Sequence, residues 1–178
     1  MRIIQHMTSS TSSTTLGQEI GKKNPFDSLP QETYLNIVRT HSVLVAEFAS
    51  LFRSKGLSDS TYNVLRILRG AGEQGCNCGQ IRSMLVSSVP DVTRLVDRLE
   101  SAGLVTRHRI DADGRVVRIR ISPTGLDRLA ELDEPVLRLH AEQLSHLNTD
   151  ELGTLSRLLE RARHRTDTET NPLQDCCE

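Results

Sequence analysis

The sequence has no tryptophan, and aromatic residues make up only 3% of its 178 residues. Its hydrophobic core must therefore be built mainly from Leu, Val and Ile, which suits a helical domain. Such a core is thin for a monomer of this length, and a second subunit would supply the missing burial. The length itself suits one domain, or one small domain with an assembly element.

The chain also lacks the signals of several other classes of protein. No apolar stretch resembles a signal peptide or reaches the length of a membrane-spanning helix, so we expect a cytoplasmic protein with no membrane partner. No nucleophile elbow, phosphate-binding loop or dinucleotide fingerprint is present, and the six histidines are scattered. We therefore expect neither an enzyme nor a bound cofactor or metal.

The folded part of the chain is expected between two loose ends. Residues 8–15 are nearly all Ser and Thr, so we expect residues 1–27 to form a disordered N-terminal arm. Residues 166–178, with their Thr, Asp, Glu and Pro, are expected to form a flexible tail. Residues 28–165 carry a succession of amphipathic helices.

The folded region begins with three helices that have clear start and stop signals. The first is expected over residues 28–54, with Ser28 as its N-cap. The second begins at Ser58 and ends in the run Gly70-Ala71-Gly72, and a short third helix begins at about Asn77 or Cys78.

The fourth helix is the most clearly marked. Ser88 and Asp91 have capping-box spacing, and Gly103 stands where a C-terminal cap glycine belongs. Its apolar residues follow at i, i+3, i+4 and i+7, and they are Val92, Leu95, Val96 and Leu99. The opposite face carries Thr93, Arg94, Asp97 and Arg98. We therefore expect one side of this helix to be buried and the other to be exposed.

After Gly103 the pattern changes from helical to alternating. Residues 104–110 and 115–121 predict two strands joined by a turn at Asp113-Gly114, and we call this hairpin the wing. A long helix follows from Ser122, and Pro135 is expected to kink it. A last helix is expected after Asn148, which has capping spacing.

Two short helices, a capped amphipathic helix and a hairpin, in this order, predict a winged helix-turn-helix domain over residues 57–122. The expected fold class is mainly α with a small β-wing. Residues 28–54 and 123–165 are interpreted as N- and C-terminal dimerisation helices because they carry apolar stripes. The same stripes would also serve for packing within one chain.

The fourth helix has the features of a DNA-reading helix. Buried on one side, it can place its other side in a major groove, which is about 12 Å wide. Ser87, Ser88 and Thr93 offer hydroxyl groups to phosphates or base edges near its N-terminus. Arg94 and Arg98 lie one turn apart and reach the same stretch of duplex. Arg94 lies nearer the inserted end and is the better candidate for reading guanine.

The whole chain has a net charge of −1, but the wing has a local excess of positive charge, which is what binding to phosphates needs. Its basic residues are Arg107, Arg109, Arg115, Arg118 and Arg120, against only Asp111 and Asp113. Arg115, beside the turn, can enter a narrow minor groove, and Asp113 can hold it extended. The sequence therefore predicts double-stranded DNA as the partner.

These segments resemble the MarR family of bacterial transcription regulators. The resemblance lies in residues 91–100 (DVTRLVDRLE) and 102–107 (AGLVTR), then in Asp113-Gly114-Arg115 and in residues 121–125 (ISPTG). It extends more loosely from about Leu29 to Arg163.

The resemblance implies a homodimer with intertwined terminal helices and two winged modules on a pseudo-palindromic operator. It implies that Arg115 enters the minor groove with Asp113 as its orienting partner, and that Thr93 and Arg94 face the major groove. It further implies a repressor that a small phenolic or other aromatic ligand releases. The residues that would line the ligand cleft are Tyr34, His41, Phe48 and Phe52.

Two alternatives remain open at the level of sequence. Cys76 and Cys78 lie near the DNA-reading helix, so a redox or metal-responsive regulator would couple thiol chemistry to DNA release. Their spacing is too short for the usual zinc-finger pair, and no His follows at ligand spacing. The second alternative is a winged-helix module that binds a protein partner, which would not need so many arginines on the wing.

Overall fold

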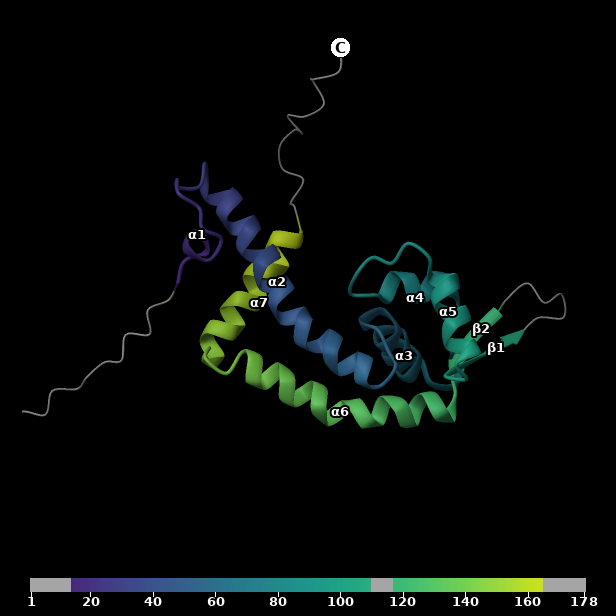
Figure 1. Ribbon diagram of the computed structural model, residues 1–178. Coiled ribbons are helices and arrows are strands. Elements are labelled where there is room, and N and C mark those ends of the chain that lie inside the picture. The colour runs from purple at the N-terminus through teal and green to yellow at the C-terminus, as the bar shows by residue number, and fades with distance from the viewer. Residues whose placement is uncertain (1–13, 110–116, 165–178) are drawn as a thin grey trace, which may run out of the picture. The chain divides into compact units, whose positions relative to one another are not determined.

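The computed structural model describes residues 14–109 and 117–164, which form seven α-helices, one 3₁₀ helix and one two-stranded antiparallel sheet (Figure 1). The elements are α1 (Leu16–Glu19), α2 (Leu29–Ser54), α3 (Asp59–Ala71), η1 (Gly72–Gln74), α4 (Cys78–Met84), α5 (Val92–Ser101), β1 (Val105–Arg109), β2 (Val117–Ile121), α6 (Pro123–Gln143) and α7 (Thr149–Arg163). This confirms the predicted fold class. The chain forms two compact units, and the boundary lies within α6, between Leu129 and Ala130.

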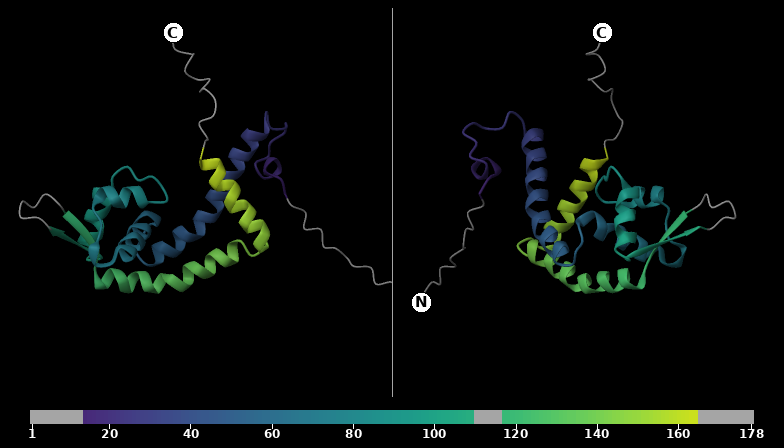
Figure 2. Two further views of the ribbon diagram at one scale, coloured as in Figure 1. Left: turned by 180° about the vertical axis from the view of Figure 1, so that it is seen from behind. Right: turned by 45° about the vertical axis from the view of Figure 1, so that its right-hand side comes forward.

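The core of the first unit lies where α3, α4 and α5 meet the hairpin of β1 and β2, and these elements gather together in both further views (Figure 2). Each contributes side chains that are almost completely buried, including Leu65 and Leu68 of α3, Ile81 of α4, Leu99 of α5 and Ile119 of β2. As the sequence predicted, the core consists mainly of Leu, Val and Ile.

Local capping sets where most helices begin. The Ser28 hydroxyl accepts a hydrogen bond from the backbone of Gln31 at the start of α2, and Ser58 caps α3. Asn148 caps α7 through a complete capping box with Glu151. These starts agree with the sequence because a cap needs only residues within one turn.

The start of α5 differs from the prediction. The N-cap is Asp91, whose carboxylate accepts the backbone N–H of Arg94 at 2.9 Å, and the helix begins at Val92. Ser88 is therefore not the cap, and Ser87 and Ser88 lie exposed in the loop between α4 and α5. Pro90 accounts for the later start because it disfavours helical backbone at Val89.

The predicted disorder of residues 1–27 is wrong between Leu16 and Glu19, where the chain forms the short helix α1. Thr15 and Gln18 form a capping box, and Leu16 is buried. Glu19 forms an ion pair with Arg39 of α2, with 3.2 Å between Oε2 and Nε. These contacts explain the helix, and Arg39 is too distant in sequence for the pairing to be predicted. Residues 1–13 lie outside the described residues.

The two strands pair as the alternating pattern predicted, with Val105 opposite Ile121 and Arg109 opposite Val117. The sequence did not reveal a third participant. Cys76 forms an isolated bridge with Ile119, each backbone N–H donating to the carbonyl of the other residue, at 3.0 and 2.8 Å. Gly75 precedes it with a φ of 60°, and a Cβ there would come within 2.5 Å of the Ile119 carbonyl oxygen.

The long helix α6 begins at Pro123, directly after Ser122, and continues through Pro135. The Ser122 hydroxyl donates to the Gly103 carbonyl at 2.6 Å and accepts from the Gly125 N–H, so it fixes the exit from the hairpin. Within the described residues, no helix combines the length and the apolar character needed to span a bilayer.

Candidate nucleic-acid interface

Helix α5 has the two-sided character that its sequence predicts. Its four apolar side chains are at most 2% exposed, and they are Val92, Leu95, Val96 and Leu99. Thr93, Arg94 and Arg98 lie on the exposed side. Because the buried side anchors the helix on the core of the unit, the exposed side is held in a fixed orientation.

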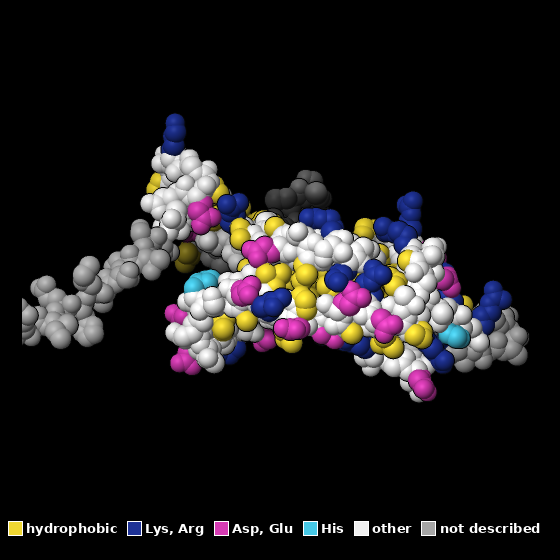
Figure 3. Space-filling model, turned by 60° about the horizontal axis from the view of Figure 1, so that its bottom comes forward, with side chains coloured by type: hydrophobic (Ala, Val, Ile, Leu, Met, Phe, Trp, Pro, Cys, Tyr) yellow, Lys and Arg dark blue, Asp and Glu magenta, His cyan; other side chains and the backbone are white. Residues whose placement is uncertain are grey.

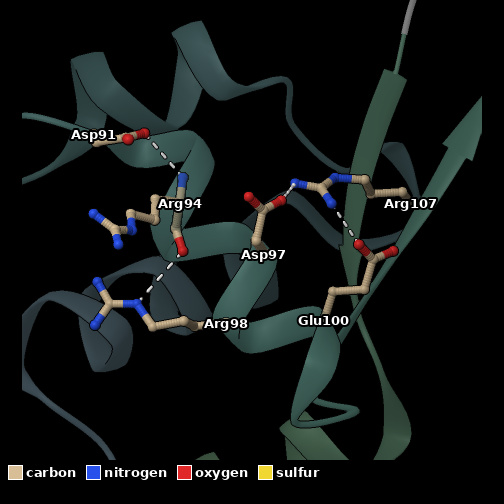
Figure 4. A network of polar contacts seen from close by, with 6 residues as sticks. All are labelled: Asp91, Arg94, Asp97, Arg98, Glu100 and Arg107. Atoms are coloured by element: carbon tan, nitrogen blue, oxygen red, sulfur yellow. Dashed lines mark hydrogen bonds and ion pairs between the residues drawn. The ribbon is translucent and has the colours of Figure 1, made fainter.

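Arg94 and Arg98 lie together on this exposed side, and their guanidinium groups point away from Arg107 (Figure 4). The Arg98 Nε donates a long hydrogen bond of 3.5 Å to the backbone carbonyl of Arg94. Arg98 also borders a hollow of about 380 Å³ that it shares with Arg53 and Ser58. The two arginines give this part of the surface a positive charge.

Arg107 of β1 does not lie where the sequence prediction needs it. One of its terminal nitrogens contacts Asp97 Oδ1 at 2.6 Å, and the other forms an ion pair with Glu100. The hydrogen bond with Asp97 is the largest cause that raises the pKa of Arg107 above its ordinary value. Its guanidinium is turned toward α5 (Figure 4), so the prediction of a direct DNA contact at this position does not match the geometry.

The remaining predicted wing residues divide into three cases. Arg109 is exposed at the end of β1. Arg118 and Arg120 of β2 are half-buried, and Arg118 donates a hydrogen bond of 2.8 Å to the side-chain oxygen of Gln80 on α4. Asp113 and Arg115 lie outside the described residues, so their pairing and the minor-groove role of Arg115 stay predictions.

The two cysteines before and at the start of α4 have different surroundings. Cys76 is 3% exposed, and burial raises the pKa of its thiol, an effect that the nearby Arg118 partly opposes. Cys78 borders a hollow of about 530 Å³ together with Thr93 of α5 and Arg107. Over residues 14–109 and 117–164, no group of three or more His, Cys, Asp or Glu side chains could hold a metal ion.

The four residues that were expected to line a ligand cleft are distributed along α2. Tyr34 and His41 are exposed and Phe48 is half-buried. Phe52, by contrast, is 2% exposed, and its ring stacks on Tyr62 of α3 with 4.3 Å between the ring centroids. The structure therefore places Phe52 in the core, because its ring has a partner that the pattern of α2 alone did not indicate.

The sequence also missed Asp97 and Glu100 as functional neighbours of Arg107. A signal was present, since alternation along a strand places Arg107 on the same face as Val105. That face packs against α5, and Val105 is 2% exposed. An arginine on a packed face requires acceptors there.

A family model described as "MarR family" matches residues 55–116 of this chain. Among solved structures, a MarR transcription factor from Planctomyces limnophilus is 43% identical, with a TM-score of 0.59, and the match covers 77% of this chain and 99% of that one. The transcriptional repressor IacR of Pseudomonas putida is 26% identical over 132 residues, or 74% of this chain and 78% of the repressor.

A third protein has a similar fold at lower sequence identity. BpsR of Bordetella bronchiseptica is 20% identical with a TM-score of 0.66, over 75% of this chain and 99% of that protein. Its DNA binding is regulated by 6-hydroxynicotinic acid.

Proposed function

This chain belongs to the MarR family of transcription regulators, and on that premise we propose that it is a repressor that binds double-stranded DNA sequence-specifically. Helix α5 enters the major groove, and the wing enters the adjacent minor groove. The observation that carries this proposal is the exposed polar side of α5, which presents Thr93, Arg94 and Arg98 while its apolar side is buried.

Each of these groups has a specific part in the proposed recognition. Arg94 lies in the first turn of α5 and donates from a planar fork, which matches the two acceptors of guanine in the major groove. Thr93, beside it, offers a hydroxyl to a base edge or a phosphate. Arg98 lies one turn further along and contacts the phosphate backbone. On the wing, Arg109 contacts phosphate and Arg115 reads the width of the minor groove.

The proposed regulator acts as a homodimer. Exposed apolar side chains on α2, among them Tyr34 and Val38, and on α7, among them Leu158, support this proposal. A second copy would cover both faces. Two-fold docking then places two α5 helices in half-sites about one helical turn apart, so the operator is a pseudo-palindrome.

The proposal includes release from DNA by a small aromatic ligand. The regulation of BpsR by 6-hydroxynicotinic acid supports this class of effector. Tyr34, His41 and Phe48 of α2 offer ring surface and polar atoms to such a ligand at the proposed dimer interface. We expect Phe52 to affect the ligand only through its packing on Tyr62.

Selection of bound sequences from a random DNA pool at near-physiological salt tests the DNA-binding function. The wild-type chain is compared with Arg94→Ala and Arg115→Ala, and Arg163→Ala on α7 is the control for loss of one positive charge. An enriched palindrome is expected for the wild type and the control. Loss of Arg94 should cost about 1–3 kcal/mol in binding free energy and relax one base position. Absence of any enriched sequence in the wild type would contradict the proposal.

A further inference from the structure

Strand β1 contacts α5 through the ion pairs of Arg107, which the proposed recognition of a DNA sequence does not itself require. The Arg107 guanidinium forks between two carboxylates, one on Asp97 and one on Glu100, which stand one turn apart on α5 (Figure 4). Its side chain is 27% exposed, against 55% and 40% for the two acids. The contact thus joins the helix that reads the major groove to the first strand of the wing.

The position of Arg107 in the strand makes this contact a consequence of the fold. Arg107 lies opposite Ile119 in the hairpin, and Ile119 is 1% exposed. Cross-strand partners point to the same face of a sheet, so Arg107 points toward the packed side of the hairpin. On that side, the N–H donors of the Arg107 guanidinium form charge-assisted hydrogen bonds with the carboxylates of Asp97 and Glu100.

The charge of the cluster argues against a phosphate ligand. One guanidinium facing two carboxylates leaves a formal charge of −1, so the cluster does not attract a phosphate. The hydrogen bond to Asp97 is the largest cause that raises the pKa of Arg107, and Glu100 acts in the same direction, against the opposing effect of burial. To contact DNA directly, Arg107 would first have to leave both partners and expose two uncompensated carboxylates near the duplex.

We propose that Arg107 is a positioning residue that fixes the wing against α5 and thereby sets the spacing between the major-groove and minor-groove contacts. This inference rests on the proposed DNA-binding function. It reassigns Arg107 from DNA contact to internal alignment, and it gives Asp97 and Glu100 the same role. Arg109, exposed two residues further along the strand, keeps the proposed phosphate contact.

The decisive experiment removes the carboxylates and retains the arginine. The double variant Asp97→Asn/Glu100→Gln frees Arg107 and adds positive charge beside the DNA. Arg107→Gln is the converse variant, and Arg109→Gln is its matched control because it removes the same charge from the same strand. Equilibrium affinities for the selected operator and for random DNA are measured for the full chain at several salt concentrations, with thermal unfolding to check folding.

The two roles predict different ratios of operator affinity to random-DNA affinity for the double variant. If Arg107 aligns the wing, random-DNA affinity rises with the added charge, and the ratio of operator affinity to random-DNA affinity falls about tenfold. If Arg107 is a phosphate ligand held back by its partners, both affinities rise together and the ratio is unchanged, which overturns the proposal. For Arg107→Gln, alignment predicts the same fall in the ratio of operator affinity to random-DNA affinity. A lost phosphate contact instead lowers the salt slope by about 0.9 for each subunit of the proposed dimer and leaves this ratio unchanged.

A further readout separates this proposal from the DNA-binding function. If the wild-type chain shows no preference for any sequence, the proposed function fails, and hydrogen exchange of the backbone amides of residues 105–109 then decides the role of Arg107. Faster exchange in the folded double variant than in the wild type supports a strand fixed by this contact. Equal exchange in the two proteins overturns it.

Discussion

The winged module, formed by α3, α4, α5 and the hairpin, differs from helices α2 and α7 in where its apolar side chains lie. In α5 every residue of the apolar stripe is buried, whereas no residue of α7 is buried and α2 buries only Phe52. Tyr34 of α2 is 66% exposed and Leu158 of α7 is 52% exposed. Figure 3 shows one face of the molecule, on which hydrophobic side chains reach the surface between charged ones.

This difference shows which parts of the protein bury their apolar side chains within one chain and which leave them exposed. The winged module buries the apolar stripe of α5 and most of its other large apolar side chains within one chain, so its core does not depend on a second molecule. Helices α2 and α7 keep several large apolar side chains exposed, and exposed apolar surface of this kind is typical of interaction sites. They are therefore the surfaces that the proposed second copy would cover, and the thin composition of the core follows from the same fact.

The largest expected effect comes from breaking the core of the winged module. Leu65→Ala removes a fully buried side chain and should lower the free energy of unfolding by about 2–5 kcal/mol. Leu158→Ala is the matched substitution on α7, and at low protein concentration it should change stability by about 0.5 kcal/mol or less. Urea unfolding followed by circular dichroism compares them. Equal losses at low concentration would show that the two regions do not differ in this way.

A second substitution tests the close approach between Gly75 and β2. Gly75→Ala places a Cβ against the Ile119 carbonyl at a positive φ, and should cost about 1–3 kcal/mol of unfolding free energy. Gly70→Ala in helix α3 has open space around the new Cβ and should instead stabilise by about 0.5–1 kcal/mol. Thermal unfolding of both variants gives the two signs, and a neutral Gly75→Ala would contradict the geometry.

A substitution on the exposed face of α2 tests directly whether its exposed apolar side chains belong to a dimer interface. Val38→Glu places a charge on an apolar position that is 43% exposed, and should weaken self-association by about tenfold or more. Thr40→Glu adds the same charge at an exposed polar position of the same helix and is the control. Sedimentation equilibrium measures the association constants. If both variants associate like the wild type, α2 is not part of a dimer interface.

The smallest expected effect concerns Cys76 and Cys78, which lie two residues apart but differ in burial: Cys76 is buried and Cys78 is half-buried. The other two cysteines of the chain, Cys176 and Cys177, are replaced by Ser so that they do not consume the reagent. In this variant, Cys78 should react with an alkylating reagent about tenfold faster than Cys76. Cys76 is buried and its raised pKa leaves less thiolate at neutral pH, so its reaction is slower. Mass spectrometry of the labelled peptides at successive times measures both rates. A faster Cys76 would point to opening of its bridge with Ile119.

The sequence predicted helices α2 to α7, the hairpin and most of the exposed side of α5 because their signals are local. The Ser58 and Asn148 caps act within one turn, and the stripe from Val92 to Leu99 repeats with the helical period. The change to alternation after Gly103 marked the hairpin, and the resemblance to a family followed from these segments. The start of α5 was misplaced because Ser88 and Asp91 are both good caps and Pro90 lies between them.

By itself, then, the sequence determined the order of the helices, the hairpin and the two faces of α5, since each depends on neighbours a few residues apart. Only the tertiary structure decided that Arg107 pairs with Asp97 and Glu100, that Cys76 bridges to Ile119, and that Phe52 stacks on Tyr62. The physical reason is that a buried polar group or ring takes whichever partner the packed elements bring to it. That partner is fixed when the elements assemble.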